Sequence, residues 1–145
     1  MDDALAVDGS AHEQEHGLRQ LVAAAADLCL KPHRHAVRFS GEPPTSTGDC
    51  QDCILLIEAR DGAGTRLPHA DLELEIYRSG RGLNLMVSRV LDDQAPLLWQ
   101  GSHPVWMGAD TGLRCDRPAD GAPLEALARR LRALLDAAGS LSEEG

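Results

Sequence analysis

The chain has 145 residues, of which 43% are hydrophobic and 26% are charged, and its formal net charge is −9. This size and balance indicate one globular domain with a single core and argue against a disordered chain. No apolar run approaches the roughly 18 to 20 residues that a membrane span requires, and the acidic start does not have the basic and apolar regions of a secretory signal. We therefore expect a cytoplasmic protein with no membrane partner.

The negative charge is concentrated at the two ends of the chain. Residues 1–17 carry five acidic side chains and residues 136–145 carry three, in both cases without any Lys or Arg. The body between them is nearly neutral and has no basic stripe, so we expect no nucleic-acid partner. We interpret residues 1–9 and 140–145 as flexible ends that flank a single domain over residues 10–139.

Two amphipathic helices are predicted, one near each end of the domain. Ser10 and Glu13 form a capping-box pattern, and apolar residues at helical spacing follow it, which predicts a helix over residues 11–30. The same spacing returns after Pro123, and Gly139 is a residue typical of a helix end. Each helix has an apolar stripe that needs a partner surface.

Five or six strands are predicted between the helices. Their ranges are 35–39, 53–60, 71–78, 83–90 and 96–107, where the last is either one bent strand or two short ones. Segment 53–60 is apolar on both alternating faces, which is typical of a strand covered on both sides, so we expect it at the centre of the sheet.

Strands 71–78 and 83–90 are predicted to form a hairpin with a turn centred on Ser79 and Gly80. This turn places the large apolar residues of one face opposite one another, in the pairs Leu72–Val87, Leu74–Leu85 and Ile76–Leu83. The opposite face is then more polar and carries Glu73, Glu75, Asn84 and Ser88. Together the elements predict a two-layer α+β domain, in which an N-terminal and a C-terminal helix pack on an antiparallel β-sheet of about five strands.

Two histidines and a Cys-x-x-Cys pair lie on either side of a loop rich in Gly and Pro. Two imidazoles and two thiolates suit tetrahedral zinc, so His33, His35, Cys50 and Cys53 are a candidate zinc site. The alternative is that these are ordinary side chains, with reduced thiols, Cys53 in the core and Cys50 on the loop. Because this combination of spacings is not a common zinc pattern, we favour the second interpretation, and zinc remains the alternative cofactor.

His12, Glu13 and His16 match the HExxH pattern of zinc hydrolases. The motif lies in the first turns of the predicted N-terminal helix, and capping already explains Glu13. A catalytic zinc also needs a third protein ligand, which the motif does not supply. We interpret this segment as a solvated helix start, keep a metal-dependent hydrolase only as a remote variant of the zinc hypothesis, and predict no catalytic residues.

Both tryptophans lie in segment 99–107 of a chain that contains only four Trp, Tyr and Phe residues. Trp is favoured at protein interfaces, so Trp99, His103, Trp106 and Met107 are a candidate interaction surface. The alternative, which we favour, is that both tryptophans pack at the end of a core that has few other bulky residues. It is also consistent with the sequence that one Trp lies in the core and the other at an interface. Without a catalytic motif, the sequence favours by elimination a non-catalytic protein-interaction module, such as an adaptor, assembly factor or regulator. Such a module pairs with a protein partner or with itself and needs no cofactor.

Overall fold

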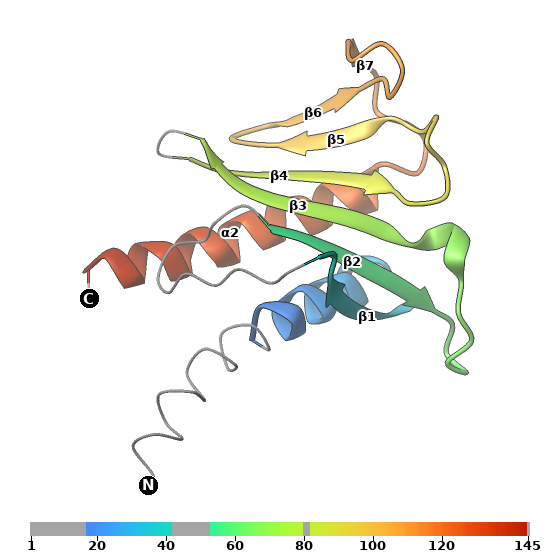
Figure 1. Ribbon diagram of the computed structural model, residues 1–145, viewed down its shortest axis with the longest axis horizontal. Coiled ribbons are helices and arrows are strands. Elements are labelled where there is room, and N and C mark those ends of the chain that lie inside the picture. Colours follow the sequence, from blue (N-terminus) through green and yellow to red (C-terminus); the bar gives the residue numbers. More distant parts are fainter. Residues whose placement is uncertain (1–16, 42–52, 80–81, 145) are drawn as a thin grey trace, which may run out of the picture.

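The computed structural model of the protein describes residues 17–41, 53–79 and 82–144, and it has two layers (Figure 1). One layer is a single antiparallel sheet in which every strand pairs with the next strand along the chain. The strands are β1 (Arg34–Phe39), β2 (Cys53–Arg60), β3 (Leu72–Ser79), β4 (Gly82–Arg89), β5 (Leu97–Gln100), β6 (Pro104–Met107) and β7 (Arg114–Cys115). The other layer consists of an N-terminal helix, described over residues 17–29, and helix α2 (Ala122–Glu144). A short 3-10 helix, η1 (Pro68–Ala70), precedes β3.

The predicted class, α+β with an antiparallel sheet and two helices, is confirmed, but the described residues form a sheet of seven strands rather than about five. Segment 96–107 forms two separate strands, β5 and β6, which pair with each other. Strand β7 then pairs with the end of β6. A two-residue strand is too short to show alternation, so its sequence contains no signal for it.

The register predicted for the β3–β4 hairpin is wrong by two residues. Leu74 pairs with Val87 and Ile76 with Leu85, and the last pair before the reversal is Ser79 with Gly82. Because side chains alternate with a period of two, a shift of two residues leaves every side chain on its predicted face. The apolar pattern therefore predicts the face, whereas the position of the turn determines the register.

Strand β2 is also not at the centre, since it lies next to the edge strand β1. Its residues alternate between buried and half-buried. Leu55 and Ile57 face the helices, whereas Ile54 and Leu56 lie on the opposite face, which no layer covers in the described part of the chain. The prediction failed because apolar residues on both faces of a strand do not reveal whether a second layer covers the outer one.

The helices differ from the prediction at one end. The N-terminal helix ends before Lys31, as expected, while Ser10 and Glu13 lie outside the described residues. Helix α2 continues past Gly139 to Glu144, so residues 140–144 extend the helix. A glycine in a helix interior costs only about 1 kcal/mol relative to alanine, so it does not by itself end a helix. No helix in the described ranges is long and apolar enough to cross a membrane.

The hydrophobic core lies between the helices and one face of the sheet. Both helices contribute to it, the first with Val22, Ala25 and Ala26, and α2 with Leu124, Leu127, Ala128 and Leu131. Both helices therefore pack on the same face, which we call the covered face. The opposite face of the sheet, the open face, has no helix on it in the described part of the chain.

Candidate functional site

The four residues of the predicted interaction surface lie in three different places. Trp106 is on the covered face of β6, only 5% exposed, and its indole Nε1–H donates to Glu125 Oε2 at 2.6 Å. Met107 follows it directly and therefore lies on the open face, as Trp99 does on β5. His103 is exposed in the turn between β5 and β6. Residues that are neighbours in the sequence therefore lie on different faces of the sheet, because side chains alternate along each strand.

Trp99 belongs instead to a group of apolar side chains on the open face of β4, β5 and β6. We call this group the β4–β6 patch, and its members are Met86, Leu97, Trp99, Val105 and Met107. The registers make it contiguous, because Met86 pairs with Trp99 and Trp99 with Val105, while Leu97 pairs with Met107. All five residues are half-buried. A contiguous apolar area that remains open on a folded domain is typical of a protein interface.

The orientation of Trp99 is fixed from two sides. Its Nε1–H donates to Tyr77 Oη at 2.7 Å, across strand β4. Its ring also lies close to Gly101, where an added Cβ would be 2.7 Å from the ring atom Cη2. A large aromatic ring that is held in place before binding loses little conformational entropy on association.

Exposed apolar residues also lie on two connections at one end of the sheet. The β4–β5 and β6–β7 connections leave the sheet at the same end because the strands alternate in direction. Val90 and Leu91 on the first connection are 43% and 66% exposed, and Leu113 on the second is 69% exposed. The first connection leads into Leu97, the first residue of β5, and the second follows Met107, the last residue of β6.

Charged residues flank the patch on both sides. Glu73 and Glu75 lie on the open face of β3, and Arg114 lies on the open face of β7. Within the described residues none of these three forms an ion pair. Negative side chains therefore lie on one side of the β4–β6 patch and a positive side chain on the other, and each can form an ion pair with a partner.

The candidate zinc ligands are not brought together as a set. His35 pairs with Ala59, which lies six residues along β2 from Cys53, or about 20 Å at the rise of a strand. One ion is therefore not in reach of both residues. Cys50, His12, Glu13 and His16 lie outside the described residues, and within the described ranges no three His, Cys, Asp or Glu residues are placed to hold a metal.

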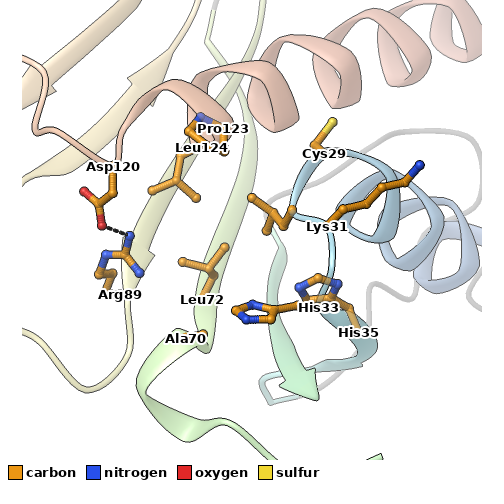
Figure 2. Close-up of a pocket in the computed structure, with 11 residues that line it drawn as sticks. Cys29, Lys31, His33, His35, Ala70, Leu72, Arg89, Asp120, Pro123 and Leu124 are labelled. Carbon is orange, nitrogen blue, oxygen red and sulfur yellow. Dashed lines mark hydrogen bonds and ion pairs between the residues drawn. The ribbon is translucent and has the colours of Figure 1, made fainter. Parts of the chain in front are cut away.

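A separate cavity of about 200 Å³ lies at one end of the core (Figure 2). Its walls come from the end of the N-terminal helix and the turn after it, the start of β1, the segment from η1 into β3, the end of β4 and the start of α2. Figure 2 shows His33 and His35 on one side of it and the Arg89–Asp120 ion pair on the other, with Leu72 and Leu124 between them. Sequence reasoning noted the two histidines but missed the cavity, since its walls come from segments about 90 residues apart.

The fold and these sites define the class of the protein: a two-layer α+β domain whose antiparallel sheet has helices on one face and, within residues 17–41, 53–79 and 82–144, none on the other. Residues 19–134 match the model of a domain of unknown function (DUF8659). This match covers most of the chain, so the protein belongs to that family. No curated protein and no solved structure matches the chain.

Proposed function

We propose that this protein is a non-catalytic, cytoplasmic protein-interaction module that forms a homodimer through the open faces of its sheets. The observation that carries the proposal is the contiguous β4–β6 patch on a sheet face without a covering layer in the described part of the chain. Such a module acts as an adaptor, assembly factor or regulator, because the patch offers apolar area and an aromatic anchor but no acid, base or nucleophile. Protein interfaces are enriched in Trp and Met, and the patch contains both.

The charges beside the patch favour a second copy of the chain as its occupant. Glu73 and Arg114 lie at the same level across the sheet. Glu73 pairs with Ser88, and Ser88 is level with Leu97 because the neighbouring residues Val87 and Leu98 pair with each other. Leu97 in turn pairs with Met107, which pairs with Arg114. If two sheets stack face to face about a two-fold axis parallel to β5, then β3 of one copy lies over β7 of the other. Stacked sheets are about 10 Å apart, a gap that Glu and Arg side chains can span together.

Such an interface is self-complementary. Apolar residues meet at its centre, and on each side of that centre Glu73 of one copy faces Arg114 of the other, which gives two such pairs in all. The exposed Leu91 and Leu113 then lie at one end of the interface, where each adds apolar area. An arrangement of this kind buries the group of residues that is least suited to water.

We expect Met107→Lys to weaken dimerisation by roughly a hundredfold, because it places a charge in the desolvated centre of the interface. Sedimentation velocity over a range of protein concentrations measures this change. The matched control is Leu134→Lys on α2, where an apolar side chain is 38% exposed on the helical side of the molecule. The control should dimerise as the wild type does, and thermal unfolding should show both variants to be folded.

A charge exchange tests the identity of the occupant. Glu73→Arg and Arg114→Glu should each weaken the dimer, whereas the double variant should recover most of the lost affinity. Recovery is expected only if the two positions meet across a two-fold interface. A wild-type protein that stays monomeric at all concentrations contradicts the homodimer. So does a photo-crosslinker at position 107 that captures a different protein instead of a second copy.

A further inference from the structure

Strand β1 forms one margin of the sheet and has a free hydrogen-bonding edge. It pairs only with β2, and in the described part of the chain no strand lies on its other side (Figure 1). The Ser40 N–H donates to the Ile54 carbonyl at 2.8 Å, so every second residue back along β1 bonds to β2. The residues between them, His35, Val37 and Phe39, therefore direct their backbone N–H and C=O groups away from the sheet. Such an edge can pair with a further strand.

Arginines line the open-face side of this edge. Val37 pairs with Ile57 of the core, so Arg34 and Arg38, which alternate with it along β1, lie on the open face. Arg34 pairs directly with Arg60 on β2, and among the described residues neither of the two forms an ion pair. Like charges directly opposite each other on neighbouring strands are destabilising, so a negative group beside them would be favoured.

The acidic side chains near this edge already have partners. Glu58 contacts Arg38 at 3.2 Å and Arg66 at 3.6 Å, and Asp71 binds Arg66. Asp61 accepts two backbone N–H groups of the turn that follows β2. Arg38 still has a side chain that is 60% exposed, so it can contact a second carboxylate. The edge therefore combines free backbone groups with guanidinium groups that remain open to an anion.

We infer that β1 binds an extended acidic peptide, which adds a strand to the sheet and places its carboxylates beside Arg34 and Arg38. The free backbone edge selects an extended chain, and the arginines select acidic side chains on one face of that chain. A second copy of β1 is not suited to this edge, because charged side chains on an edge strand oppose its pairing with an identical strand.

The register of β1 also predicts the spacing within the peptide. The peptide residues opposite Arg34 and Arg38 are four positions apart and share one face of the added strand. The residues on its other face lie beside His35 and Val37, and Val37 packs against the core cluster. The expected pattern is therefore an acidic residue, an apolar residue, any residue, an apolar residue and a second acidic residue.

This edge is separate from the interface of the proposed dimer. In that dimer β3 of one copy lies over β7 of the other, and β1 lies two strands further out than β3. No strand of the second copy therefore covers β1. The Met107→Lys variant is expected to bind the peptide as the wild type does, so the two proposals can fail independently.

Fluorescence anisotropy with the full chain and a fluorescein-labelled peptide, Thr-Glu-Val-Thr-Val-Glu-Thr, tests the inference. The matched control peptide has glutamine at both glutamate positions and the same β-propensity on its other face. We expect saturable binding of the acidic peptide, and binding of the control about tenfold weaker or less, because the control cannot form the ion pairs. Equal affinities, or no saturable binding of the acidic peptide, would overturn the inference.

Amide hydrogen exchange followed by NMR tests where the peptide lies. A saturating amount of the acidic peptide should slow the exchange of the Val37 and Phe39 amides by about tenfold or more, because these N–H groups gain acceptors. The amides of Ala36 and Arg38 already bond to β2 and should change much less. Binding without protection of Val37 and Phe39 would show that the peptide occupies another surface.

Two variants test the two parts of the edge separately. Arg34→Glu reverses the charge of an exposed side chain and should weaken binding by about tenfold or more. Val37→Pro removes an N–H from the free edge, a position at which strands tolerate proline, and should have a similar effect. Arg130→Glu, at an exposed arginine of α2, is the matched control and should bind as the wild type does. Unchanged affinity in both edge variants would refute the site.

Discussion

Replacing Trp106 by alanine is expected to lower the free energy of unfolding by about 3–5 kcal/mol. The side chain is 5% exposed and belongs to the core cluster. Its ring lies so close to the start of α2 that a Cβ added at Gly121 would be 2.8 Å from Cζ2. Truncation leaves a cavity here, and it also removes the donor to Glu125 Oε2. Urea unfolding followed by far-ultraviolet circular dichroism measures the loss.

Two matched variants separate the contributions of Trp106. Trp106→Phe keeps an aromatic ring but removes the indole N–H, so we expect it to recover most of the packing and to cost about 1–2 kcal/mol. Trp99→Ala removes the same side chain from the open face, outside the core cluster, and should destabilise the monomer much less. For a domain of this size the loss at Trp106 corresponds to a fall in Tm on the order of 10 °C. Weaker self-association with an unchanged Tm would instead mean that Trp106 is an interface residue.

Replacing Asp71 by alanine is expected to cost about 2–4 kcal/mol, a large effect for a residue at the start of a strand. Asp71 is 8% exposed, and its Oδ1 accepts the backbone N–H of Ala59 at 2.8 Å. Both carboxylate oxygens also accept from Arg66, at 3.1 Å and 2.8 Å. The side chain therefore connects the start of β3 to β2, and its removal leaves a buried N–H without an acceptor.

Asp71→Asn tests which part of this network matters. The amide oxygen can still accept from Ala59, but the charge that Arg66 binds is lost, so we expect a cost of about 1–2 kcal/mol. Asp93→Ala, on the exposed β4–β5 connection, is the control and should change the stability by less than about 0.5 kcal/mol. If Asp71→Ala and Asp71→Asn destabilise the protein equally, then the bond to Ala59 contributes nothing.

The sites show how far sequence patterns reach. The concentration of both tryptophans in segment 99–107 indicated an important region, but Trp106 and Trp99 differ in face and in role. Asp71 looked like the first residue of a strand, and no local signal reveals that its partners are Ala59 and Arg66. Met86 and Val105, which complete the β4–β6 patch, were not singled out either. Their proximity to Trp99 follows from strand pairing, which depends on turns and registers.

What the sequence by itself determined is local: the two amphipathic helices, the alternating strands, and the side of the hairpin on which each residue lies. These features depend on spacing within one segment, and a register shift of two residues does not change them. Only the tertiary structure decided that both helices cover the same face, that β2 lies next to an edge, and that His35 is far from Cys53. Such relations join residues that are distant along the chain, and they are set by the packing of the whole core. The open face and the cavity beside His35 are consequences of that packing.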